Sequence, residues 1–132
     1  MKRVLVVEDE YGSAQALALL LECEGFEVDV AANGRLALEL IARTRPDLVV
    51  TDYMMPVMDG ARLGRAIRTD PALADLPIVL ATSAEEARVR EAFDDYDAYL
   101  RKPFGAAQLV PLARTLAERG RPRREPSGGP SP

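Results

Sequence analysis

A regular alternation of short apolar runs and amphipathic segments constrains the fold of this chain more than any other feature. Residues 3–7 and 48–51 are β-branched apolar runs without polar alternation, and residues 77–81 are similar. Weaker runs of the same kind lie at residues 28–31 and 98–100. Short unbroken apolar runs are typical of strands that are covered on both faces of a parallel sheet.

The segments between these runs have apolar residues every three or four positions, as expected for helices. Their apolar positions are Leu17, Leu20 and Leu21; Ala37, Leu40 and Ile41; Leu63, Ala66 and Ile67; Val89, Ala92 and Phe93; and Leu109, Leu112 and Leu116. We expect Gly25 to end the first helix, Asn33 to cap the second and Pro46 to stop it. Residues 83–86 (Ser-Ala-Glu-Glu) match a capping box for the fourth. Strand and helix thus alternate about five times, which predicts an α/β fold with a doubly wound parallel sheet.

The composition fits one globular domain, since 48% of the residues are apolar and 29% are charged. We expect this domain to span residues 1–119. Residues 120–132 hold four prolines and no apolar periodicity. They are therefore predicted to form a disordered tail. Contact between the tail arginines and an acidic partner is the less favoured alternative.

Charge and residue usage exclude several classes of function. The net charge is −4 and residues 121–132 carry +2, so residues 1–120 carry −6, which argues against a sequence-reading nucleic-acid domain. The absence of histidine excludes a His-ligated zinc site and a Ser-His-Asp triad, and Cys23 has no partner for an intramolecular disulfide. We expect Cys23 to be a small apolar residue on a helix. No leader or membrane-spanning stretch is evident, so a cytoplasmic protein is expected.

Reactive side chains follow the predicted strands. They are Glu8, Asp9 and Glu10 after the first strand, Asp52 after the third, Thr82 and Ser83 at the end of the fourth, and Lys102 after the fifth. In an open α/β sheet these strand ends face one crevice. Crowded carboxylates favour a bound hard cation such as Mg²⁺, and a metal with a lysine suits phosphoryl transfer. Asp52 is therefore a candidate nucleophile.

Four segments occur in an order that resembles the receiver domain of two-component response regulators. They are Val6-Val7-Glu8-Asp9-Glu10, residues 48–60 (LVVTDYMMPVMDG), Ala81-Thr82-Ser83-Ala84 and residues 99–104 (YLRKPF). The resemblance covers about residues 2–119, and D-x-M-M-P-x-M-D-G is its most specific element. It implies a flavodoxin-like sheet of five parallel strands in the order 2-1-3-4-5 with about five helices.

The resemblance also implies a phosphorylation site. Asp52 is the expected phosphoacceptor, and Lys102 is expected to pair with the phosphoryl oxygens. The implied cofactor is Mg²⁺ or Mn²⁺, with Asp9 and Asp52 as direct ligands, Glu8 as a ligand through water and the backbone carbonyl of Met54 as a further ligand.

The implied switch residues are Thr82 and Tyr99. In the family the matching hydroxyl moves to hydrogen-bond the phosphoryl group, and the matching aromatic side chain then swings inward. The family's Lys-Pro bond is commonly cis, which Pro103 permits.

Each of these residues also has a structural interpretation. Asp52 is placed to cap the turn after its strand, Asp9 and Glu10 to stabilise a helix N-terminus, and Tyr99 to be a half-buried aromatic residue. Asp59 is expected to cap the following helix, and the nearby methionines to pack the loop. Only the complete set of motifs favours the functional interpretation.

On this interpretation the chain is a stand-alone response regulator whose phosphorylation changes a protein-binding surface. It is not an enzyme in the usual sense, although it accepts a phosphoryl group and promotes its own phosphorylation and dephosphorylation. The expected partners are a histidine kinase or a histidine phosphotransfer protein, and an unidentified target protein. We expect no direct nucleic-acid contact and no membrane insertion. Formation of a homodimer is an open alternative. The alternative is a receiver-like interaction module that works without phosphorylation. A flavin carrier is disfavoured because Glu8, Asp9 and Glu10 would repel a flavin phosphate.

Two departures from the family pattern affect the predicted helices. Only 20 positions separate Thr82 from Lys102, and Phe93, Asp94 and Asp95 replace the small pair usual before the fifth strand. We therefore expect a short or distorted fourth helix and an altered partner surface. Pro111 predicts a late start or a kink in the fifth helix.

Overall fold

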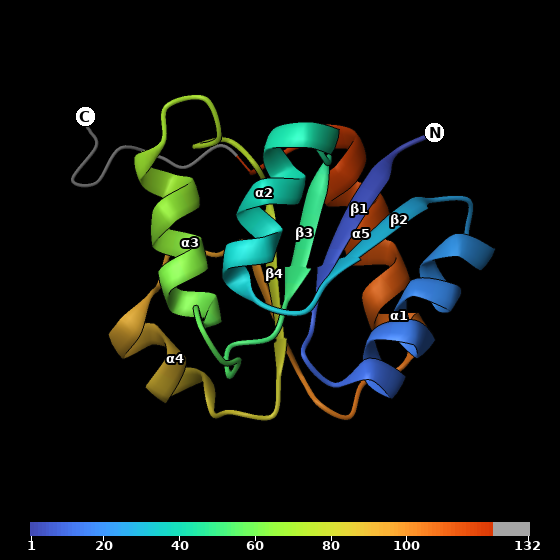
Figure 1. Cartoon of the computed structure of the whole chain (residues 1–132). Coiled ribbons are helices and arrows are strands. Elements are labelled where there is room, and N and C mark those ends of the chain that lie inside the picture. Colours follow the sequence, from blue (N-terminus) through green and yellow to red (C-terminus); the bar gives the residue numbers. More distant parts are fainter. Residues whose placement is uncertain (123–132) are drawn as a thin grey trace, which may run out of the picture.

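The computed structural model describes residues 1–122, in which strands and helices alternate from β1 to α5 (Figure 1). The elements are β1 (Arg3–Val7), α1 (Tyr11–Cys23), β2 (Glu27–Ala31), α2 (Gly34–Thr44), β3 (Leu48–Thr51), α3 (Gly60–Thr69), β4 (Ile78–Thr82), α4 (Glu86–Ala92), β5 (Ala98–Arg101) and α5 (Ala106–Arg119). The predicted strands are confirmed with shifts of one residue at some ends. Residues 123–132, most of the predicted tail, lie outside the described residues.

The five strands form one parallel sheet in the order β2-β1-β3-β4-β5, which confirms the flavodoxin-like doubly wound fold. The register aligns the carboxyl ends of the central strands, because Val7 of β1 pairs with both Ala31 of β2 and Thr51 of β3. Thr82 of β4 pairs with Arg101 of β5. The residues that follow these strands are thus brought to one edge of the sheet.

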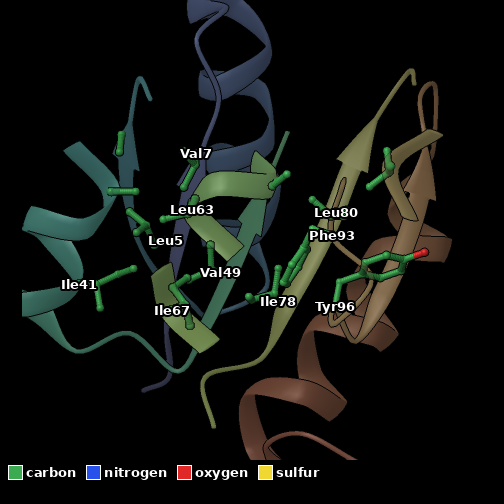
Figure 2. Close-up of a cluster of buried hydrophobic side chains, with 14 of the residues drawn as sticks. Leu5, Val7, Ile41, Val49, Leu63, Ile67, Ile78, Leu80, Phe93 and Tyr96 are labelled. Atoms are coloured by element: carbon green, nitrogen blue, oxygen red, sulfur yellow. The ribbon is translucent and has the colours of Figure 1, made fainter. Parts of the chain in front are cut away.

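Helices cover both faces of the sheet, with α1 and α5 on one side and α2, α3 and α4 on the other (Figure 1). Strand β1 shows why its sequence lacks polar alternation. Leu5 and Val7 belong to the apolar cluster beneath α2 and α3, whereas Val4 and Val6 belong to the cluster beneath α1 and α5. Figure 2 shows the first of these clusters. Both faces of the strand are buried from Val4 to Val7, so these four residues must be apolar.

Most helix ends follow the predicted signals. Asn33 caps α2 by accepting a hydrogen bond from the Leu36 amide (2.9 Å), and Asp59 caps α3 in the same way. Gly25, with φ of 95°, lies just beyond α1 as expected. The capping box at residues 83–86 is wrong, because α4 begins at Glu86 and its N-cap Glu85 makes no side-chain cap bond.

Helix α4 is short, as predicted, and the segment after it is held by α3. The Phe93 ring lies against Gly64 of α3, where an added Cβ would come within 2.5 Å of it. Asp97 accepts hydrogen bonds from the side chains of Arg68 (3.0 Å) and Arg121 (2.8 Å). Phe93 and Asp97 therefore fix the segment between α4 and β5 to its neighbours.

Three further expectations concern α1, α5 and the tail. Cys23 is the last residue of α1, so it lies on a helix as expected, but it is exposed. Helix α5 runs through Pro111 from Ala106, so it does not start late. Arg121, which we assigned to the tail, is bonded to Asp97.

Candidate functional site

Backbone hydrogen bonds place the site residues at the carboxyl edge of the sheet. The amide of Asp52 donates to the carbonyl of Val7 (3.0 Å), which extends the pairing of β3 with β1 beyond the strand. The amide of Lys102 donates to the carbonyl of Thr82 (2.9 Å) and extends β5 along β4 in the same way. The sheet itself therefore sets the positions from which these side chains emerge.

Asp52 uses its two carboxylate oxygens differently. Oδ1 accepts hydrogen bonds from the amides of Tyr53 (2.6 Å) and Met54 (3.2 Å), which is the turn-capping role expected from position alone. Oδ2 accepts a hydrogen bond from Nζ of Lys102 (2.9 Å). The Asp52 side chain is 11% exposed. Asp52 thus caps its own loop and still presents an oxygen to a cation.

Lys102 is shared between two carboxylates. Its Nζ donates to Oε1 of Glu8 as well as to Asp52, and the Glu8 side chain is only 6% exposed. Burial lowers the pKa of Lys102, but the hydrogen bonds and charges of Glu8 and Asp52 outweigh burial, so the pKa is raised overall. Lys102 therefore stays charged throughout the physiological range.

The acidic groups exceed the cations that face them. Glu8 and Asp52 share the one ammonium group of Lys102, and Asp9, which is exposed, follows directly after Glu8. Two carboxylates on one ammonium leave one negative charge before Asp9 is counted, and all the donors are oxygens, so the set fits a hard divalent cation. Within residues 1–122 no three acidic, His or Cys side chains already converge on one point. The Glu8, Asp9 and Asp52 metal set stays a prediction.

The two predicted switch residues, Thr82 and Tyr99, both form hydrogen bonds with the backbone of Ala84. Thr82 is fully buried, and its Oγ1 accepts a hydrogen bond from the amide of Ala84 (3.3 Å). The Tyr99 hydroxyl donates to the carbonyl of the same residue. Burial raises the pKa of Tyr99, so this hydroxyl keeps its proton. A movement of either side chain is thus felt at Ala84.

Several features of the site were missed by sequence reasoning. The buried Thr51 hydroxyl donates to the carbonyl of Asp52 (2.8 Å). The N-terminal role expected for Glu10 takes the form of a side-chain cap, in which Glu10 accepts from the amide of Ser13 (2.6 Å). The Glu8 and Lys102 ion pair could have been found, because both residues follow strand ends.

The methionines of the β3–α3 loop differ in burial. Met55 and Met58 are partly buried against the apolar cluster of Figure 2, as expected for loop packing. Met54, whose carbonyl is the predicted metal ligand, is 45% exposed.

Comparison with known proteins identifies the family. The response regulator receiver domain model matches residues 4–114. This chain belongs to the receiver domain family of response regulators. Receiver domains act as signalling switches in two-component systems rather than as ordinary enzymes.

Individual relatives agree with this assignment. Response regulator MprA of Mycolicibacterium vanbaalenii is 40% identical over 122 residues, which cover 91% of this chain and 52% of that protein. This receiver domain therefore spans about half the length of that relative.

Two solved receiver domains of histidine kinases have the same fold. The one from Syntrophus aciditrophicus has a TM-score of 0.83 and 31% identity, with 89% of this chain and 91% of that chain covered. The one from the sensor kinase PA1611 of Pseudomonas aeruginosa has a TM-score of 0.80 and 27% identity, with 89% and 98% covered. That structure holds a magnesium ion in its active-site cleft. Among residues 1–122 of the present chain, no helix has the length and apolar character to cross a bilayer.

Proposed function

We propose that this receiver domain is a phosphoacceptor switch in which Asp52 takes a phosphoryl group in a Mg²⁺-dependent reaction. The phosphoryl donor is a histidine kinase or a histidine phosphotransfer protein, and the result is a changed protein-binding surface. The single observation that carries this proposal is the placement of the Asp52 carboxylate, 2.9 Å from the Lys102 ammonium at the carboxyl edge of the sheet. A cytoplasmic location, a domain at residues 1–119 and a tail at residues 120–132 belong to the same proposal.

The side chains of the site have distinct roles in this reaction. A carboxylate oxygen of Asp52 attacks phosphorus, and the bond from phosphorus to the donor's leaving group breaks as the acyl phosphate forms. The Lys102 ammonium, already hydrogen-bonded to Asp52, pairs with oxygens of the transferred group. Glu8 orients Lys102 through their ion pair.

The metal would be held by Asp9, Asp52, the Met54 carbonyl and, through water, Glu8. When bound, Mg²⁺ supplies positive charge that neutralises the transferred phosphoryl group and offsets the surplus of carboxylates. Mn²⁺ has similar ligand preferences and is expected to substitute.

Phosphorylation alters the link between Thr82 and Tyr99. The modification adds about −1.5 to −2 charges and new acceptor oxygens at Asp52. The Thr82 hydroxyl leaves the Ala84 amide and donates to the phosphoryl group, so the loop at Ala84 and the Tyr99 side chain rearrange together. The surface of α4 and β5 then presents a different shape to a protein partner.

Intact-mass measurement after incubation with Mg²⁺ and acetyl phosphate tests the proposal. Wild type should gain the mass of one phosphoryl group in an acid-labile form, and Asp52→Asn should gain none. Asp59→Asn is the matched control, because Asp59 lies on the same loop and asparagine also caps helices well, so this variant should be labelled normally.

An unlabelled wild-type protein would favour the alternative, a receiver-like interaction module that works without phosphorylation. Equal labelling of wild type and Asp52→Asn would instead show that the acceptor is another residue.

A further inference from the structure

The loop between β3 and α3, residues 52–59, carries both Asp52 and the Met54 carbonyl. The two ends of the loop lie close together. The amide of Gly60 donates to the carbonyl of Tyr53 (2.8 Å), and a Cβ on Gly60 would lie 2.3 Å from the Asp52 carbonyl. Val57 within the loop has φ of 70°, a conformation that is unfavourable for a β-branched residue. The backbone of this loop is thus constrained, so a displacement of one part of the loop moves the rest.

Helix α2 contacts this loop through Gly34, far from it in sequence. The amide of Gly34 donates to the carbonyl of Met58 (3.0 Å). Gly34 is the first residue of α2, and an amide in the first turn has no carbonyl acceptor within its own helix. Asn33 caps the amide of Leu36, which leaves the amide of Gly34 available for Met58.

Position 34 has no space for a side chain. A Cβ there would lie 2.8 Å from the backbone oxygen of Met58 and 2.8 Å from Cγ of the same residue. Bringing the oxygen to an ordinary contact of 3.4 Å requires a retreat of about 0.6 Å. The obstacle includes backbone, so a change of side-chain rotamer does not remove it.

We propose that Gly34 is a positioning residue for the phosphorylation loop. Because Gly34 has no side chain, the Met58 carbonyl packs directly against the start of α2. This contact positions the loop so that Asp52 accepts the phosphoryl group and the Met54 carbonyl binds the metal. This inference rests on the proposed function. A side chain at position 34 moves the loop and so weakens metal binding and phosphorylation, although residue 34 contacts neither the metal nor the phosphoryl group.

The test compares Gly34→Ala with two matched variants. Gly12→Ala places the same methyl group in the first turn of α1, where the nearest atom is at an ordinary 3.4 Å. Ile41→Val removes a buried methylene from the same helix, seven residues beyond Gly34, at a cost of about 0.5–1.5 kcal/mol. The Ile41→Val variant therefore shows how a loss of stability in α2 alone affects metal binding and phosphorylation.

We expect Gly34→Ala to bind Mg²⁺ about tenfold more weakly by calorimetry, as is typical when a supporting residue of a metal site is changed. Its phosphorylation rate at saturating Mg²⁺ should fall about tenfold, because displacements of this size are costly to reaction geometry. Gly12→Ala and Ile41→Val should match wild type in both measurements. Equal losses in Ile41→Val and Gly34→Ala, or wild-type affinity in Gly34→Ala, would overturn the inference.

Amide spectra give a readout that needs no phosphoryl group. In the metal-free protein Gly34→Ala should shift the amide resonances of residues 53–55 and 57–59 and leave those of β4 in place. Unchanged loop resonances would refute the inference. If wild type takes no phosphoryl group, the proposed function fails, and these spectra still decide whether Gly34 places the loop.

A measurement on wild type covers the case in which Gly34→Ala does not fold. Mg²⁺ should then shift the amide resonance of Gly34 and not that of Gly25, at the far end of α1. An unmoved Gly34 resonance would contradict the coupling of α2 to the loop.

Discussion

Replacing Lys102 by methionine tests the electrostatic account of the site. The change keeps the length and apolar volume of the side chain and removes the ammonium that Glu8 and Asp52 share. These two carboxylates, 6% and 11% exposed, then face each other without a counter-charge. We therefore expect Lys102→Met to destabilise the metal-free protein.

The size of the effect follows from burial. Removing one partner of a fully buried ion pair costs about 3–5 kcal/mol. The Lys102 side chain is 28% exposed, so water recovers part of this, and we expect about 2 kcal/mol. For a domain of this size such a loss lowers Tm by about 8 °C. Mg²⁺ should offset the loss, since a ligand at about 100 times its Kd stabilises by about 2.7 kcal/mol.

Thermal unfolding with EDTA and with Mg²⁺ measures both effects. Mg²⁺ should raise the Tm of Lys102→Met more than that of wild type, because the cation is then the main counter-charge for the carboxylates. Lys2→Met, which changes the chain's other lysine at an exposed position, should behave as wild type. Adding Asp52→Asn to Lys102→Met should restore stability in EDTA. An undiminished Tm in EDTA, or equal Mg²⁺ shifts in both proteins, would refute the reasoning.

Three further predictions concern the rest of the molecule. Asp97→Ala should cost about 3–4 kcal/mol in urea unfolding, because it removes the acceptor of two arginine side chains, whereas the exposed Asp94→Ala should cost almost nothing. Phe93→Ala should cost about 3–5 kcal/mol and leave labelling of the site intact; lost labelling would contradict this. Burial raises the pKa values of Tyr96 and Tyr99 in the folded protein. Their contribution to the free energy of unfolding is therefore fully present below about pH 10 and is lost as the pH rises through the raised values, which urea midpoints measured against pH will check.

Local sequence signals predicted most of the framework because the responsible interactions are themselves local. An Asn33 or Asp59 side chain reaches an amide three residues ahead, so the sequence alone specifies these caps. The unbroken apolar run of β1 likewise reflects burial on both faces, which any central parallel strand requires. Strand order followed from the family motifs rather than from the runs themselves.

The failures occur where tertiary contacts override a local pattern. The capping box at residues 83–86 does not form: α4 begins only at Glu86, and the Glu86 carboxylate accepts a hydrogen bond from the Tyr96 hydroxyl. The exposure of Cys23 was not predictable either. Helix α1 is apolar around much of its surface, so Leu19 is 62% exposed while Leu21 is fully buried. Composition cannot say which apolar residues of such a helix face the core.

The energetics of α4 indicate where a phosphorylation signal can spread at low cost. The beginning of α4 is held in part by two tyrosine hydrogen bonds. The bond from Tyr99 to the Ala84 carbonyl is worth about 0.5–1.5 kcal/mol, and the bond from Tyr96 to the charged Glu86 carboxylate is worth about 1.5–3 kcal/mol. A hydrogen bond from a hydroxyl to a charged phosphoryl group is worth about 1.5–3 kcal/mol, which is enough to replace one of these. The end of α4 is held by the Phe93 ring, whose burial is worth more than any single hydrogen bond. On the proposed function, the start of α4 therefore rearranges while its end stays fixed to α3, and the changed surface lies over the first turn of α4, the loop before it and Tyr99 of β5.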